Sequence, residues 1–323
     1  MTDATGRTVA LPQAVEDVVA VGPGALNLVA YLDAVDMVVG VEENEHSWGR
    51  NNPYNIANPV LRDKPVIGPH KGGDPELIAD ADPDVVVGTY MTAGTARDLQ
   101  ATIERPVVVL KAEGRPLHQL EKFYGDLRFA AGVLDRSERA AAVIDFVRSE
   151  ITALQERAGT VSGAERDRVF LAGRSDSGGA GVTSTQHPFA PFAFVDAGNV
   201  ASSVAGHATV SRETLLTWNP GVIFISESNL DRVAEALAGP SYADVAAIES
   251  GDIYGLLPSR FYGNLYGSVL ADAYFVGSVL YPDAFGDVDP AGEADRLYQR
   301  LLGAPVYGEL ADRFGGFMRV ELG

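Results

Sequence analysis

Residues 116–159, PLHQLEKFYGDLRFAAGVLDRSERAAAVIDFVRSEITALQERAG, interrupt an otherwise regular alternation of short apolar runs and helical stretches. The segment is rich in helix-forming residues, and its composition predicts a helix that ends near Gly132. A second helix is expected to begin after Asp135 or Ser137, which are good N-cap residues, and to continue for roughly 20 residues or about 30 Å. Apolar residues recur along it every three or four positions, at Ala141, Ile144, Val147, Ile151 and Leu154.

On both sides of this segment, short β-rich runs are separated by helices of about ten residues, as in a parallel sheet. The clearest runs are DVVAVG (17–22), DVVVGTY (84–90), DRVFLAG (167–173), GVIFIS (221–226) and DIYGLLP (252–258). We therefore expect an α/β fold of two lobes, each with a central, mainly parallel sheet, joined by one long helix. The expected ranges are 1–117 for the N-terminal lobe, 118–158 for the helical segment and 159–323 for the C-terminal lobe. A cleft between two such lobes is the default place for a ligand.

Composition excludes several classes of function. The formal net charge of the 323-residue chain is −19, which argues against a nucleic-acid or anionic-membrane binder, because these need a basic face. The absence of cysteine excludes disulfides, thiolate metal sites, iron–sulfur clusters and cysteine nucleophiles. No apolar run reaches the roughly 18 to 20 residues that span a bilayer. The opening MTDATGRTVALP lacks the basic and apolar regions of a signal peptide, and nothing predicts an oligomer, so a monomer is expected.

Sequence motifs give little support to an enzyme. The glycine-rich stretch near residue 180 has no Gly-Lys-Ser/Thr ending, no serine has the flanking glycines of a hydrolase nucleophile, and the five histidines form no HxH or HExxH pair. Asp176, Glu227 and His187 are the obvious acid–base candidates, and they do not form a recognisable constellation. The sequence therefore favours a binding protein, with no catalytic residues.

Several phrases, in order, resemble one family of transport proteins. They are TDATGRTVALP (2–12), DVVAVGPGALNLVAYLDAVDMVVGV (17–41), DPELIADADPDVVVGT (74–89), TVSRETLLTWNPGVIFIS (209–226) and ESGDIYGLLP (249–258). Together they resemble the substrate-binding proteins of ABC importers, in the helical-backbone (class III) group that serves siderophores, haem, cobalamin and related metal chelates. The resemblance implies a rigid linking helix, a small hinge motion and a shallow cleft.

The resemblance also implies cargo, partners and location. The cargo would be a metal chelate, most simply an iron–siderophore complex, held without any resident cofactor. Haem, a corrinoid or a molybdate-type oxyanion is the alternative, and a chelatase or cofactor-handling enzyme is the alternative from another class. The partner would be a permease with its ATPase, which Glu76 and Glu213 would meet at the outer tips of the lobes. The protein would be extracytoplasmic, in the periplasm or lipid-anchored at the outer face of the cytoplasmic membrane.

By position in the family, the cargo meets the loops that follow strand ends. Aromatic side chains on such loops suit a large planar or chelated ligand, and arginine forks suit its anionic groups. The small and hydroxyl residues near 178–185 resemble an anion-holding nest. His70 could also reach a chelated metal as an axial ligand. The expected ligand-binding residues are Trp48, Tyr54, His70, Tyr90, Arg174, Thr185, Gln186, His187, Arg260, Tyr262, Asn264 and Tyr266.

Overall fold

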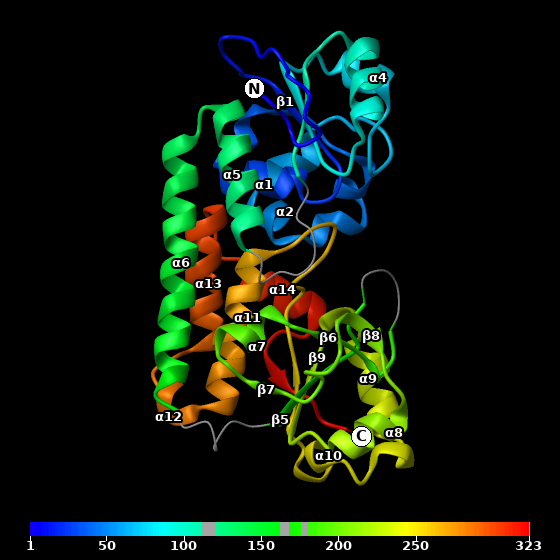
Figure 1. Ribbon diagram of the computed structural model, residues 1–323, viewed down its shortest axis with the longest axis vertical. Helices are drawn as coiled ribbons and strands as arrows, with labels where there is room; N and C mark the ends of the chain where they lie inside the picture. Colours follow the sequence, from blue (N-terminus) through cyan, green and yellow to red (C-terminus); the bar gives the residue numbers. More distant parts are fainter. Residues whose placement is uncertain (112–119, 162–167, 176–179, 323) are drawn as a thin grey trace.

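The computed structural model describes residues 1–111, 120–161, 168–175 and 180–322, and its backbone forms two α/β lobes stacked end to end (Figure 1). Lobe one contains a four-stranded sheet in the order β2-β1-β3-β4, and all its strand pairs are parallel. Its elements are β1 (Val18–Val21), α1 (Ala25–Tyr31), β2 (Val38–Gly40), α2 (Pro53–Ala57), α3 (Pro75–Asp80), β3 (Val85–Gly88), α4 (Ala93–Ile103) and β4 (Val107–Val109).

Lobe two contains a five-stranded sheet in the order β11-β10-β9-β5-β7, parallel except for β11, and a separate β6–β8 hairpin. Its strands are β5 (Arg168–Ala172), β6 (Ser184–His187), β7 (Gly198–Asn199), β8 (Gly206–Thr209), β9 (Val222–Ile225), β10 (Ile253–Gly255) and β11 (Met318–Arg319). Its helices are α7 (Ala190–Phe194), α8 (Arg212–Trp218), α9 (Leu230–Leu237), α10 (Ala246–Ser250), α11 (Tyr266–Leu280), α12 (Pro282–Phe285), α13 (Pro290–Leu302) and α14 (Tyr307–Phe314).

Valine and isoleucine runs form the central strands because both faces of a parallel sheet are covered by helices. Every residue of β1, β3 and β9 is buried. The predicted fold class, two α/β lobes with mainly parallel sheets, is confirmed by this arrangement. The predicted boundary at 117/118 falls outside the described residues, and the one at 158/159 falls in the last turn of a helix, so the domain ranges stay predictions.

The long helix predicted from the sequence is α6 (Ser137–Gly159), whose 23 residues run along one side of both lobes (Figure 1). The preceding helix, α5 (Leu120–Leu134), ends two residues beyond the predicted end near Gly132, and Asp135 then adopts a left-handed backbone with φ of 53°. One detail of the prediction is wrong. The N-cap of α6 is Arg136, with no side-chain cap, and Ser137 is already helical.

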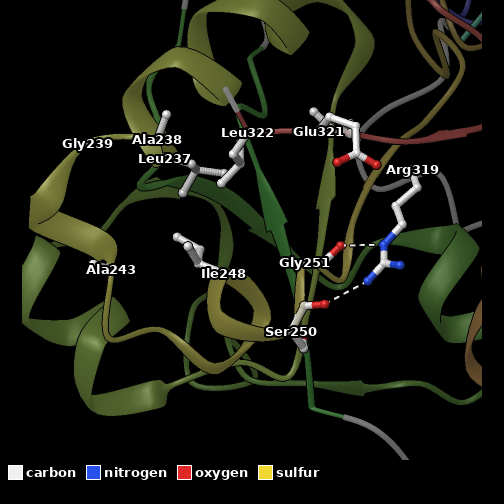
Figure 2. A pocket seen from close by; sticks show the side chains of 11 residues that line it. Leu237, Ala238, Gly239, Ala243, Ile248, Ser250, Gly251, Arg319, Glu321 and Leu322 are labelled. Carbon is white, nitrogen blue, oxygen red and sulfur yellow. Dashed lines mark hydrogen bonds between the residues drawn. The ribbon is translucent and has the colours of Figure 1, made fainter.

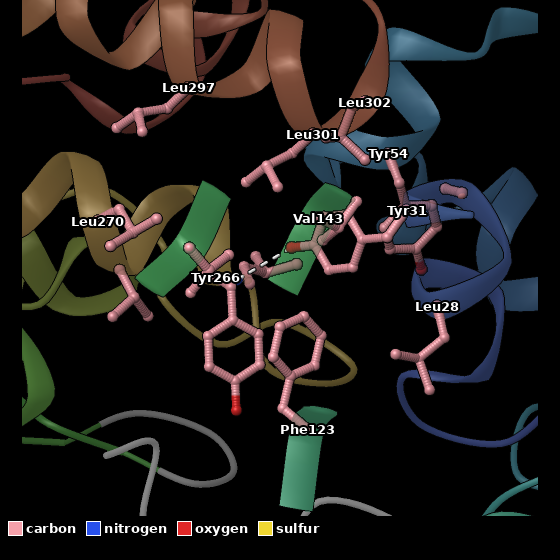
Figure 3. Close-up of a cluster of buried hydrophobic side chains, with 14 of the residues drawn as sticks. Leu28, Tyr31, Tyr54, Phe123, Val143, Tyr266, Leu270, Leu297, Leu301 and Leu302 are labelled. Carbon is pink, nitrogen blue, oxygen red and sulfur yellow. Dashed lines mark hydrogen bonds between the residues drawn. The ribbon is translucent and has the colours of Figure 1, made fainter. Parts of the chain in front are cut away.

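One apolar core continues from lobe one into lobe two along α6. Valines and tyrosines of β1 and α1 belong to the same cluster of buried side chains as residues of β5, α11 and α13. At its centre the Tyr266 ring stacks on Phe123, with ring centroids 4.0 Å apart, and the backbone N–H of Tyr266 donates to the Tyr31 hydroxyl at 3.0 Å (Figure 3). The Arg139 side chain adds polar bonds, donating to Tyr31 O at 2.9 Å and to Leu301 O at 2.9 Å.

None of the helices in the described part of the chain combines the length and the apolar character that a membrane crossing needs.

Substituting alanine at Gly277 is expected to destabilise the protein. A Cβ at this position of α11 would lie 2.5 Å from the buried Phe285 ring, so overpacking should cost roughly 1 to 3 kcal/mol in the free energy of unfolding. Gly125→Ala in α5 is the matched control, because its Cβ would meet no atom within 4 Å. Removing a flexible glycine there should stabilise the fold by up to about 1 kcal/mol. Urea denaturation of both variants measures the difference, and equal shifts would contradict the packing of α11 on α12.

Candidate binding site

The two lobes meet where a loop of lobe two, residues 259–265, reaches the strand ends of lobe one. This loop follows β10 and leads into α11, and it appears as the gold segment below lobe one in Figure 1. The N–H of Gly24 donates to Tyr262 O at 2.9 Å, and the Asn27 amide donates to Asn264 O at 2.9 Å. A Cβ on Gly263 would lie 2.7 Å from the Gly24 backbone, so only glycine permits this approach.

A small cavity lies at this junction, at the carboxyl ends of β1 and β3, where ligands bind in open parallel sheets. Its volume is about 20 Å³, which is room for one water-sized group. Arg260 and Asp126 are its charged residues. The lining comprises Pro23, Gly24, Asn27, Leu28, Thr89, Tyr90, Asp126, Arg260, Gly263 and Asn264. Three of the predicted ligand residues, Tyr90, Arg260 and Asn264, therefore come together here, and Tyr90 is 60% exposed.

Glu42 anchors the same loop from lobe one. Its buried carboxylate accepts hydrogen bonds from the Tyr262 hydroxyl at 2.7 Å, from Gly22 N at 3.0 Å and from Gly72 N at 2.9 Å. The Tyr262 hydroxyl in turn accepts the N–H of Lys71 at 2.8 Å. Burial raises the pKa of Glu42 and, together with the nearby Glu42 charge, raises the pKa of Tyr262. Tyr262 is thus held as a neutral bridge between the lobes.

An aromatic group borders this bridge. The Trp48 ring packs edge-on against His70, Phe261 and Tyr262, with ring centroids 6.1, 5.5 and 5.3 Å apart. Trp48 remains 42% exposed, and His70 Nδ1 lies 3.7 Å from a carboxylate oxygen of Glu43. The structure therefore brings together three more of the predicted residues, Trp48, His70 and Tyr262.

Tyr54 does not have the predicted position. We expected an exposed aromatic on a loop, but Tyr54 lies in α2 and is buried, with its hydroxyl 3.0 and 3.1 Å from the two carboxylate oxygens of Glu45. Asn44 and Asn55 also donate to Glu45, at 2.8 and 2.5 Å. Burial raises the pKa of Glu45 to about 7 in spite of these donors. The asparagines of this stretch support a polar network inside lobe one, which the sequence pattern alone did not distinguish from a binding loop.

Tyr266 is a second correction. The sequence suggested that it faces cargo, but it is the first residue of α11 and lies in the core against Phe123 (Figure 3). The next residue, Gly267, is also helical. Helix α11 is apolar on nearly all sides and is therefore buried almost completely.

The predicted residues of lobe two form a separate, mostly buried group. Arg174 Nε donates to Gln186 Oε1 at 3.0 Å, and both residues, with Thr185, are buried. His187 is half-buried, and Ser184–His187 is a strand paired with β8, so the last two residues of the predicted anion-holding stretch, Ser184 and Thr185, are part of a strand. Arg174, Thr185, Gln186 and His187 do not line the cavity at the junction. Gly178, Gly179 and Asp176, which belong to the stretches considered in the sequence analysis, lie outside the described residues.

The sequence analysis missed Asn27, Glu42 and Asp126. All three are buried polar residues beside the junction, and each has its partners in segments distant along the chain, such as Asn264 for Asn27. A polar residue inside an apolar helical pattern is the only sequence signal for Asn27 and Asp126.

Larger hollows lie elsewhere. One of about 390 Å³ sits at the far end of lobe two, beside α10 and β11 (Figure 2). The Arg319 side chain there donates to Gly251 O and Ser250 O, at 2.6 and 2.7 Å, so its guanidinium already has structural partners. Another, about 730 Å³ and open, runs over α5 and α6. Neither is lined by a predicted ligand residue.

Within the described ranges, no three His, Asp or Glu side chains gather in a way that could hold a metal ion. Glu76 and Glu213 have the predicted position: each is exposed in the first turn of a helix, α3 and α8, where the helix dipole favours a carboxylate.

A model of the periplasmic binding protein family matches residues 18–259, which is most of the chain, and the protein therefore belongs to this family. The resemblance drawn from the sequence is confirmed at this level. Extracytoplasmic location is supported by the same membership. The named relatives are binding proteins rather than enzymes, which confirms the expectation that the chain has no enzymatic role.

Individual relatives show the same architecture. The molybdate-binding protein MolA of Haemophilus influenzae is 26% identical, over 93% of this chain and 90% of its own. The solved structure of molybdate-bound MolA superposes with a TM-score of 0.72 at 23% identity, covering 94% and 98% of the two chains. A periplasmic solute binding protein of Veillonella parvula gives 0.76 at 18% identity, covering 97% and 95%. The haem-binding protein HutB of Vibrio cholerae gives 0.62 at 20%, covering 82% and 99%.

Replacing Glu45 by glutamine is expected to remove part of the pH dependence of stability. The carboxyl pKa is about 7 in the folded protein and 4.5 in the reference state, so the unfolded chain ionises first as pH rises. The free energy of unfolding should therefore fall between about pH 4.5 and about pH 7, by roughly 1 to 3 kcal/mol. Urea denaturation across this range should give a flatter profile for Glu45→Gln than for the wild type. The exposed neighbour Glu43→Gln is the control, and parallel profiles for the wild type and Glu45→Gln would refute the assignment.

Proposed function

We propose that the protein captures a compact metal oxyanion of the molybdate type outside the cytoplasm and delivers it to an ABC importer. Family membership supports the role of binding protein. The relative MolA, matched over nine-tenths of both chains, is described as molybdate-binding and as cognate to an ABC transporter. At 26% identity this relative suggests the kind of cargo, and the site has to support it independently.

The observation that carries the proposal is the small cavity at the lobe junction, with Arg260 in its wall. A guanidinium presents several N–H donors to an anionic oxygen in fixed geometry. Room for one water-sized group suits a single oxygen of a tetrahedral anion, while the other oxygens would lie towards the exposed Tyr90. A siderophore complex, by contrast, would need a cleft of several hundred Å³.

The metal chelate predicted from the sequence is the second candidate. It is favoured by the aromatic group around Trp48, whose exposed ring could lie against a flat or chelated ligand. An iron–siderophore complex, haem and a corrinoid all belong to this candidate. In each case His70, which packs against Trp48, would be the candidate side chain to ligate the metal of the cargo.

The importer would contact the N-terminal ends of α3 in lobe one and α8 in lobe two. Glu76 and Glu213 are exposed carboxylates on different lobes, so a partner with two basic patches could contact both at once. The permease and its ATPase are the proposed partners of a monomer. Lipid anchoring remains a prediction from the family resemblance.

Arg260→Ala is expected to weaken molybdate binding by about 10- to 100-fold, because it removes a charged hydrogen-bond donor worth roughly 1.5 to 3 kcal/mol. Isothermal titration of the wild type and the variant measures this change. Arg62→Ala, at an exposed position of lobe one outside the cavity, is the charge-matched control.

The same titration includes a ferric siderophore, haem and cobalamin, with Trp48 fluorescence as a second readout. Saturable binding of molybdate that depends on Arg260 supports the oxyanion. Binding of a chelate alone, with quenching of Trp48, would overturn it in favour of the second candidate.

Glu76→Arg is expected to leave cargo affinity unchanged and to impair uptake, because the substitution reverses charge at an exposed helix start remote from the cavity lining. Uptake of labelled cargo by cells that carry the variant, compared with titration of the purified protein, separates the two effects. Glu16→Arg, another exposed glutamate of lobe one, controls for the change in net charge. Normal uptake with Glu76→Arg would remove this residue from the docking surface.

A further inference from the structure

Two buried oxygen atoms beside the junction have no hydrogen-bond partner in the described part of the chain. They are Oδ2 of Asp126 and Oδ1 of Asn27, and both residues line the cavity that contains Arg260. Asp126 is 2% exposed and Asn27 is 4% exposed. A buried acceptor without a donor is costly, so these two atoms mark a place where a hydrogen is needed.

Both side chains are held in place by their other polar atoms. Asp126 Oδ1 accepts the backbone N–H of Lys111 at 2.8 Å, and the Asn27 amide group donates to Asn264 O at 2.9 Å. The second bond also fixes which end of the Asn27 amide is oxygen, because its partner is a carbonyl. Neither residue can therefore satisfy its free oxygen by a simple flip.

An oxyanion bound here would place its own lone pairs and negative charge next to Asp126 Oδ2 and Asn27 Oδ1, which already lack a hydrogen-bond donor. Arg260 can offset the charge, but an ionised Asp126 would still repel the cargo oxygen. A proton between Asp126 Oδ2 and the cargo oxygen removes this repulsion, because one of these two oxygens then donates a hydrogen bond to the other. Burial already raises the pKa of Asp126, which lowers the cost of adding this proton.

Resting on the oxyanion function proposed above, we propose that Asp126 is the selectivity residue of the site and that each bound oxyanion brings one proton, shared between Asp126 Oδ2 and a cargo oxygen. The proton comes from solvent, and no covalent bond is made or broken in the cargo's metal–oxygen framework. An anion that cannot share a proton with Asp126 Oδ2 at the pH of the surroundings would bind more weakly, because the ionised Asp126 carboxylate would repel it.

Charged and titratable groups lie near Asp126 on several elements of the described part of the chain. Arg260 and the Tyr90 hydroxyl line the same cavity, and Lys111 acts on Asp126 through its backbone bond and its charge. From α1, the titratable side chain is Tyr31, whose hydroxyl accepts the N–H of Tyr266. On α5 and α6, Glu121 and Arg148 pair with each other at 3.1 Å.

The sign of the pH effect follows from linkage. Bound anion stabilises the protonated pair, so the apparent pKa of the pair is higher with cargo than the pKa of Asp126 without it. Affinity is therefore greatest at pH values below the cargo-free pKa. It falls as pH rises between the two pKa values, by up to about tenfold per pH unit.

The experiment is isothermal titration of the full chain with molybdate between about pH 5.5 and about pH 8.5, in pairs of buffers with different ionisation enthalpies. The wild type should take up about one proton per anion, and its affinity should fall as pH rises. In Asp126→Asn the side-chain amide can still donate a hydrogen bond to the cargo but cannot ionise. The affinity of this variant for molybdate should therefore be nearly independent of pH. The variant should also bind more tightly than the wild type at the alkaline end. Asp145→Asn, exposed on α6, is the matched control and should behave like the wild type.

Each outcome decides one point. If the wild type binds molybdate without proton uptake, or if Asp126→Asn keeps the wild-type pH slope, the inference about Asp126 is overturned while the oxyanion function stands. If neither molybdate nor another oxyanion binds at any pH, the proposed function fails first. Should Asp126→Asn not fold, as judged by its circular dichroism and melting, the proton count of the wild type still decides the question.

Discussion

The continuous apolar core along α6 is the constraint on which the rest of the structure depends. Helices α11 and α13 of lobe two pack against helices of lobe one in the same cluster of buried side chains. Opening this core would expose stacked rings such as Tyr266 on Phe123 and leave the Arg139 bonds without partners. Separating the lobes would therefore cost free energy, because buried apolar surface would be exposed to water.

Because the core fixes the lobes, the loop at 259–265 can be shaped by partners on the opposite lobe. Tyr262 carries this contact through its hydroxyl, which lies between the Glu42 carboxylate and the Lys71 N–H. The close approach of Gly263 to Gly24 brings Arg260 beside the strand ends of lobe one. A residue of lobe two thus completes a site whose other walls come largely from lobe one.

The electrostatics of the junction are set by burial. Glu42, Glu45 and Asp126 all have raised pKa values, because the free-energy cost of removing each carboxylate from water exceeds the stabilisation that its hydrogen-bond donors provide. Glu42 and Glu45 are surrounded by donors, whereas Oδ2 of Asp126 has no donor among the described residues. That difference is the basis for the proposal that Asp126, unlike Glu42 and Glu45, interacts with cargo.

Periodicity and local helix chemistry were enough to predict the α/β class, the long helix and the first-turn positions of Glu76 and Glu213, and the resemblance of several phrases to known binding proteins predicted the family. The resemblance to the family also predicted that Arg260 faces the cargo, and Arg260 lies in the wall of the junction cavity. Only the tertiary structure decided that Tyr54 and Tyr266 are core residues, and that Arg174 turns to Gln186 instead of the cavity. Burial and pairing across distant segments have no signature in local spacing. For the same reason the sequence did not identify Asp126, because the cavity that it lines is formed by segments distant along the chain.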